Sequence, residues 1–180
     1  MRGFPKNEVR DAMISETMLD KTPQDRSRLA VWSAVAGLSE FIAGRLSNLV
    51  LLVGRLAMGF IFFQSGVAKL GALSVFSASL STRGVPFPGF WGPVGAISEF
   101  VGGAAIILGL GTRWAALLIV VFVMAATGIA HRYWEFVEPA TRRLQEGQFY
   151  KNLAIIGGAL FLFVCGAGRF SLDALLTRKK

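Results

Sequence analysis

Cysteine and histidine are almost absent from this chain of 180 residues. The one cysteine, Cys165, has no partner for a disulfide within the chain or for a redox pair. One histidine and one cysteine cannot supply the ligands of a zinc site, and the sequence has no pair of histidines for haem. We therefore expect neither a metal site nor a tightly bound cofactor.

Charged residues are scarce too. They make up 17% of the sequence, against roughly 25% in soluble domains, while hydrophobic residues make up 53%. The apolar residues lie in four blocks, each near the ~20 residues that a helix needs to cross a bilayer. The sequence therefore predicts an all-α integral membrane four-helix bundle with antiparallel, up-down spans at residues 49–70, 94–110, 114–130 and 152–168.

The basic excess, a net charge of +8, has an ordinary explanation in a membrane protein. Lysine and arginine gather at the ends of the apolar blocks, where they meet lipid headgroups, and no basic run interleaved with aromatic residues suggests a nucleic-acid surface. Of the 19 basic residues, twelve lie on the side of the two termini and six on the opposite side. This bias predicts a multi-pass protein of the plasma membrane with both termini in the cytoplasm.

The two ends of the chain are polar. Residues 1–48 form an N-terminal tail, of which residues 1–28 mix both charge signs and are expected to be flexible. Residues 27–47 are moderately apolar, and we expect either an amphipathic helix that lies on the membrane or an extension of the first span. The membrane domain covers residues 49–173, and residues 174–180 form a basic C-terminal tail.

Two longer loops connect the spans. The loop at residues 71–92 contains a short surface helix at 74–82, followed by a Pro- and Gly-rich stretch. Pro93 suits the first turn of the second span, where a missing N–H does no harm. The loop at residues 132–150 is charged and polar.

Polar side chains in the spans converge on one level of the membrane, and such groups commonly face the protein interior or a cavity. Lys69 ends the first span, Glu99 lies early in the second, and His131 ends the third. The fourth span begins with a lysine and an asparagine, so antiparallel spans place these groups toward the same leaflet. An arginine 14 residues before Lys69 lies about 21 Å away, near the other surface. The candidate residues for a quinone or proton site are Arg55, Lys69, Glu99, His131, Lys151 and Asn152.

These groups also have a purely structural explanation. Glu99 paired with Lys69 would lock the bundle, while Lys151 and His131 would extend toward lipid headgroups. Without a lysine nearby, Glu99 would tend to bind a proton, because burial disfavours its charged form. The sequence leaves the functional and the structural explanation open.

Six short motifs follow one another along residues 49–173. They are RLAMGF at 55–60, GVAKL at 66–70, GVPFP at 84–88, EFVGG at 99–103, LGLGTR at 108–113 and GAGRFSLD at 166–173. In this order they resemble the DoxX family of small four-helix membrane proteins. Among the candidate residues, Arg55, Lys69 and Glu99 occupy positions that look like the family's pattern.

The resemblance implies a four-helix membrane fold and a connection with redox chemistry. Some DoxX relatives are linked to quinone-dependent thiosulfate oxidation or to terminal oxidases, and others to oxidative or thiol stress. We therefore expect a membrane subunit of a redox complex that interacts with quinone. A small transporter or permease and a scaffold without chemistry are the alternatives. The expected partners are the lipid bilayer, redox-protein subunits or further copies of the chain, and not nucleic acid.

Overall fold

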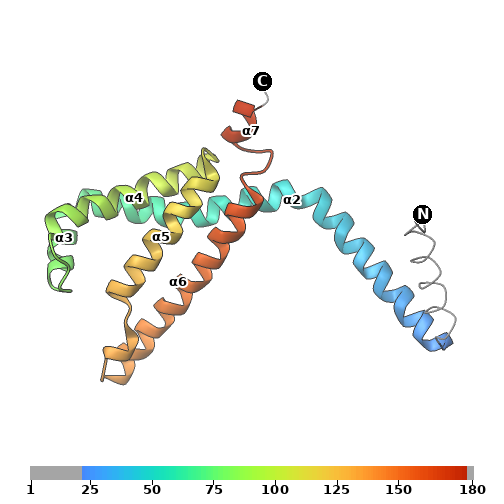
Figure 1. Ribbon diagram of the computed structural model, residues 1–180, viewed down its shortest axis with the longest axis horizontal. Helices are drawn as coiled ribbons and strands as arrows, with labels where there is room; N and C mark the ends of the chain where they lie inside the picture. Colours follow the sequence, from blue (N-terminus) through green and yellow to red (C-terminus); the bar gives the residue numbers. More distant parts are fainter. Residues whose placement is uncertain (1–21, 178–180) are drawn as a thin grey trace, which may run out of the picture. The chain divides into compact units, whose positions relative to one another are not determined.

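A computed structural model describes residues 22–177, a range in which helices, turns and short connections occur and no strand is formed (Figure 1). Within this range, four helices are long and apolar enough to cross a membrane. The predicted all-α membrane fold is thus confirmed. The chain divides into two compact units, Met1–Leu46 and Ser47–Lys180.

The first helix, α2 (Pro23–Gly71), has 49 residues and belongs to both units. No proline follows Pro23 within it, and its many alanine and leucine residues favour a continuous helix. The sequence predicts that residues 1–28 form a flexible tail. In the structure residues 23–28 are helical, so α2 begins earlier than expected. Residues 27–47 are helical and continuous with the first span. The earlier part of the tail, residues 1–21, lies outside the described residues, as do residues 178–180.

Two helices follow α2 along the chain. The short helix α3 (Leu73–Ser81) lies where the sequence predicted a surface helix. The next helix, α4 (Pro88–Leu108), begins at Pro88, so the predicted start near Pro93 is wrong. Pro88 occupies the first turn, where its missing N–H needs no partner, whereas Pro93 lies inside the helix.

A tight turn joins α4 to α5 (Thr112–Ala130). Gly109 and Gly111 have φ values of 67° and 54°, in the left-handed region that favours glycine. This three-residue connection makes α4 and α5 consecutive antiparallel helices, as the sequence predicted.

The fourth spanning helix, α6 (Pro139–Cys165), occupies most of the segment that was predicted to be a charged loop. Only the short 3-10 helix η1 (Tyr133–Glu135) and its neighbours separate it from α5. The Glu138 carboxylate caps the start of α6, accepting hydrogen bonds from the N–H groups of Thr141 and Ala140 at 2.5 and 2.8 Å. Hydrogen bonds from Thr141 and then Ala140 lower the pKa of Glu138. The sequence reading missed this cap, which starts the helix before its apolar part.

The last described helix is α7 (Leu172–Thr177), after a turn at the end of α6.

The spanning helices α5 and α6 lie side by side (Figure 1). Their facing sides build a small core with α2 and α4, while large apolar side chains such as Phe161 (75% exposed) point outward. Such an outer surface is unfavourable in water and suits lipid. The core consists of Phe62, Ile106, Ala115, Ala116, Ile119, Val120, Val123, Ala159 and Leu162.

Glycines bring α2 and α4 into backbone contact. A Cβ atom at Gly66 would collide with the backbone of Phe100, and one at Gly103 would collide with the backbone of Phe63. Small residues that allow helices to approach closely are typical of membrane proteins. This contact sets the distance between the two helices that carry Lys69 and Glu99.

Candidate functional site

Lys69 at the end of α2 and Glu99 in α4 form an ion pair. Lys69 Nζ lies 2.6 Å from Glu99 Oε1 and 2.7 Å from Oε2. The side chains are 27% and 6% exposed, respectively. A carboxylate as deeply buried as Glu99 requires a partner, because an unpaired charge in a low-dielectric interior is strongly unfavourable. The pair therefore joins α2 to α4 at this level of the membrane.

Two aromatic rings surround the ammonium group of Lys69. Its Nζ atom lies 4.9 Å from the ring centroid of Phe76 and 5.7 Å from that of Phe122. Both distances are within the range of a favourable cation–π interaction. The lysine is thus held from three directions, by a carboxylate from α4 and by rings from α3 and α5.

A second polar group lies between α5 and α6. His131, at the end of α5, has its Nδ1 atom 2.8 Å from Gln145 Oε1. Asn152 Nδ2 donates to Thr127 Oγ1 at 2.8 Å, and that hydroxyl donates to the Val123 carbonyl at 2.6 Å. Among residues 22–177, only Nδ1 of His131 has a hydrogen-bond partner, so its Nε2 atom can form a further hydrogen bond.

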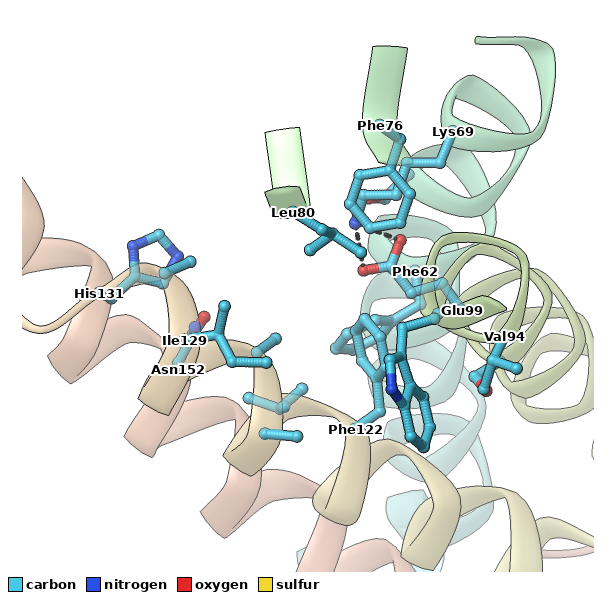
Figure 2. Close-up of a pocket in the computed structure, with 18 of the residues that line it drawn as sticks. Phe62, Lys69, Phe76, Leu80, Val94, Glu99, Phe122, Ile129, His131 and Asn152 are labelled. Carbon is cyan, nitrogen blue, oxygen red and sulfur yellow. Dashed lines mark hydrogen bonds and ion pairs between the residues drawn. The ribbon is translucent and has the colours of Figure 1, made fainter. Parts of the chain in front are cut away.

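The two polar groups face one cavity of about 850 Å³, which lies within the second unit. Figure 2 shows the Lys69–Glu99 pair on one side and His131 with Asn152 on the other. Apolar and aromatic side chains from α2 to α6 form most of the wall between them, including Phe62, Phe76 and Phe122. The volume falls within the ~300–1,000 Å³ typical of small-molecule sites.

Of the six candidate residues, five line this cavity: Lys69, Glu99, His131, Lys151 and Asn152. Lys151 is exposed, and its ammonium group donates to Gln148 Oε1 one turn earlier on α6. It therefore contributes a positive charge at the edge of the site.

Arg55 lies elsewhere and does not line the cavity. Its side chain is 2% exposed and donates to the carbonyl oxygens of Ala167, Phe170 and Ile107 at 2.5, 3.0 and 3.1 Å. These carbonyls belong to the end of α4 and to the turn after α6. The contacts assign Arg55 a structural task, to hold the C-terminal turn against the bundle.

Asp173 supports the same end of the bundle, although the sequence reading attached no role to it. Its two carboxylate oxygens accept hydrogen bonds from the N–H groups of Gly111 and Thr112 at 2.7 and 3.0 Å. Burial alone would raise the pKa of Asp173. The hydrogen bonds from Thr112 and Gly111, with the charge of Arg55, outweigh burial and lower that pKa below its usual value.

The sequence reading also missed several residues that line the cavity or orient its polar groups. Phe76, Trp91 and Phe122 are wall residues, but an aromatic side chain in an apolar helix carries no local signal of what it faces. Arg83 lines the cavity from the α3–α4 loop and donates to the Ala130 carbonyl at 3.1 Å. Thr127, by contrast, shares a helix face with His131 in the sequence pattern, four residues before it, but was not among the candidate site residues.

The sequence is similar to a known family of membrane proteins and to individual proteins. The sequence model of the DoxX family matches residues 50–132. The inner membrane protein YqjF of Escherichia coli K12 is 33% identical over 135 residues, which cover 75% of this chain and 98% of the relative. This chain belongs to the DoxX family. The family match contains both members of the ion pair and His131.

Two further relatives are membrane proteins, and a second family model also matches part of the chain. The inner membrane protein YphA of E. coli K12 is 29% identical over 136 residues, covering 76% of this chain and 96% of the relative. An uncharacterized membrane protein of Mycobacterium tuberculosis, Rv3486, is 27% identical over 139 residues, covering 69% of this chain and 80% of the relative. The model of the SURF4 family matches residues 94–180. No solved structure matches the chain.

Proposed function

We propose that this DoxX protein is a quinone-binding membrane subunit of a redox complex in the cell membrane. The observation that carries the proposal is the cavity that has a buried ion pair on one side and a histidine–asparagine group on the other. A site for an apolar molecule with a polar ring requires a mainly apolar wall and a few well-placed polar groups. The cavity meets both requirements.

Quinone carbonyl oxygens accept hydrogen bonds, and the cavity offers donors on both sides. Lys69 Nζ has three hydrogens, and its two bonds to Glu99 leave one for a ligand. Asn152 Nδ2 has two hydrogens, and its bond to Thr127 leaves one. His131 supplies a ring nitrogen that can donate or accept according to its tautomer. Two carbonyls at opposite ends of one ring could be bound from these two sides.

Reduction of a quinone to a quinol takes up two electrons and two protons. In the ion pair the transferable proton lies on the Lys69 ammonium beside the Glu99 carboxylate, and His131 is a side chain that can carry a proton on the other side of the cavity. In the proposed complex the electrons come from a redox cofactor of a partner subunit. The task of this subunit is therefore to hold the quinone and to supply its protons.

Quinone binding can be measured in nanodiscs by titrating decylubiquinone and following tryptophan fluorescence, since Trp91 lines the cavity. We expect Glu99→Gln to weaken binding at least tenfold, or about 1.4 kcal/mol, because it unbalances the charge beside the bound ring. Glu40→Gln makes the same chemical change on the exposed part of α2 and should leave binding unchanged. Circular dichroism establishes that each variant remains folded.

Exchanging the pair, with Lys69→Glu and Glu99→Lys together, separates a binding role from a structural one. The exchange retains an ion pair but moves the ammonium group to α4. We expect a folded protein that binds decylubiquinone weakly. Unchanged binding in both the exchanged protein and Glu99→Gln would assign the pair to the fold alone and count against the proposed site.

The redox-complex part of the proposal has its own measurement. Purification of the tagged protein from native membranes in mild detergent should recover a dehydrogenase, oxidase or sulfurtransferase subunit in fixed ratio. Quinone binding by a protein that copurifies with no redox enzyme would contradict the proposed complex while leaving the binding site intact.

A further inference from the structure

The helix α2 is much longer than one membrane crossing requires. Its 49 residues extend for about 73 Å at ~1.5 Å per residue, whereas the hydrocarbon core is ~30 Å thick. The part of α2 that belongs to the second unit, residues 47–71, already has enough residues for one span. Residues 24–46 of the first unit are therefore an additional helical segment whose environment needs an explanation.

This segment is exposed along its whole length and has two different faces. Large apolar side chains recur at steps of three and four residues, which places them on one face of the helix. The opposite face carries Arg26, Ser33, Gly37, Glu40 and Gly44, with Leu29 as a large apolar side chain at its start. The apolar stripe consists of Val31, Val35, Leu38, Ile42 and Leu46, which are 45–62% exposed.

Charges lie on both faces of the segment, since Arg26 is opposite the apolar stripe. Arg28 and Arg45 border the apolar stripe on its two sides, and the Arg45 guanidinium lies 5.1 Å from the ring centroid of Phe41. Glu40 is on the opposite face. Arginines beside an apolar stripe can bury their stems in lipid and reach phosphate groups, while a carboxylate on the far side avoids them.

We propose that residues 24–46 lie in the plane of the membrane and bind its anionic surface, so that α2 changes direction between this segment and the span, at the boundary of the two units next to Leu46. The apolar stripe enters the boundary between headgroups and acyl chains, and Arg28 and Arg45 contact the phosphates of acidic lipids. A second copy of the chain fits less well, because pairing two such stripes would bring their arginine borders together. The proposal is independent of the quinone site, which lies in the second unit.

Spin labels on the full-length protein test the orientation of the segment. Replacing Cys165, the one cysteine, by alanine gives a background for single cysteines. Labels at Val35 and Ile42 report on the apolar stripe, and labels at Ser33 and Gly37 report on the opposite face. In proteoliposomes of phosphatidylcholine and phosphatidylglycerol, collisions with oxygen report lipid contact and collisions with a nickel chelate report water contact.

We expect the labels on the stripe to relax several-fold faster with oxygen than those on the opposite face, and the reverse with the nickel chelate. Equal water contact at all four positions would overturn the proposal, because the helix would then stand free of the membrane. Equal lipid contact would overturn it as well, since the segment would be a span. A short distance between labels of two copies at Val35 would assign the stripe to a dimer instead.

The role of the arginines is tested without any change to the fold. Liposomes of phosphatidylcholine alone, or the double change Arg28→Gln and Arg45→Gln, should lower the oxygen signal at Val35 and raise the nickel signal. Glu40→Gln should change neither, because that side chain faces away from the lipid. A stripe that stays in the lipid regardless of charge would disprove binding to acidic headgroups.

Discussion

Arg55 joins three parts of the chain through one side chain, and its geometry requires a guanidinium group. The Nη1 atom donates to Ala167, while Nη2 donates to both Ile107 and Phe170. A lysine at this position would donate from a single nitrogen atom, which cannot reach carbonyls on both sides. Arg55→Lys should therefore leave buried carbonyl oxygens without donors.

We expect Arg55→Lys to lower the free energy of unfolding by about 3 kcal/mol or more, since hydrogen bonds from a charged group contribute ~1.5–3 kcal/mol each. Titration with sodium dodecyl sulfate in mixed micelles measures this loss. Arg142→Lys, an exposed arginine near the start of α6, is the matched control and should change stability little. Equal stability of the two variants would contradict the structural task assigned to Arg55.

Asp173 makes the stability of the same end dependent on pH. Its pKa is lower in the folded than in the unfolded chain, so the unfolded chain binds a proton first as the pH falls. The stabilisation is therefore fully present above the unfolded pKa of ~3.9 and disappears as the pH falls through the folded value.

The variant Asp173→Asn removes this dependence. At pH 7 we expect it to be about 1 kcal/mol less stable than the natural protein, the usual loss when a capping carboxylate is replaced. The two proteins should become equally stable as the pH is lowered through the acid range. Detergent-denaturation midpoints at several pH values measure the difference, and a gap that widens at low pH would refute the assignment.

At the scale of the helices, close contact between α2 and α4 depends on Gly66 and Gly103. Gly66→Leu should separate the helices, lower stability by about 2 kcal/mol or more and weaken quinone binding, because Lys69 is displaced from Glu99. Gly157→Ala on α6 is the control, since no atom lies within 4 Å of the added Cβ position. Thermal aggregation in detergent and decylubiquinone titration give the two readouts. Normal binding by a destabilised Gly66→Leu protein would show that helix spacing does not position the pair.

The helices could be predicted from sequence where hydropathy alone decides them. The span of α5 was located within two residues of its observed start, because no charge interrupts the apolar run from Trp114 to Ala130. Hydropathy could not locate the beginning of α6, where the Glu138 cap starts a helix among charged residues. The level shared by Lys69, Glu99 and His131 followed from the antiparallel order of the spans. The position of Arg55 away from the cavity could not be predicted in this way, because its partners are backbone carbonyl oxygens, which carry no sequence signal.

At the scale of the whole molecule, four crossings by the apolar helices of the described residues predict that both ends of the chain face the same side of the membrane. Twelve of the 19 basic residues lie on that side, so the positive-inside bias predicts that the ends face the cytoplasm. The connection between η1 and α6 then lies on the opposite side, where the Val137 side chain is 96% exposed. Thr177 in α7 is exposed near the other end of the bundle.

Single cysteines at these two positions measure the orientation in a Cys165→Ala background. In spheroplasts, a membrane-impermeant maleimide should label Val137→Cys at once and Thr177→Cys only after the membrane is permeabilised. The opposite pattern would reverse the topology and place the acidic-lipid-binding segment at the outer leaflet. Because acidic lipids attract basic segments chiefly at the cytoplasmic leaflet, that result would also remove the physical reason for the arginine contacts of α2. The labelling pattern thus tests the charge bias of the whole chain together with the environment proposed for its first helix.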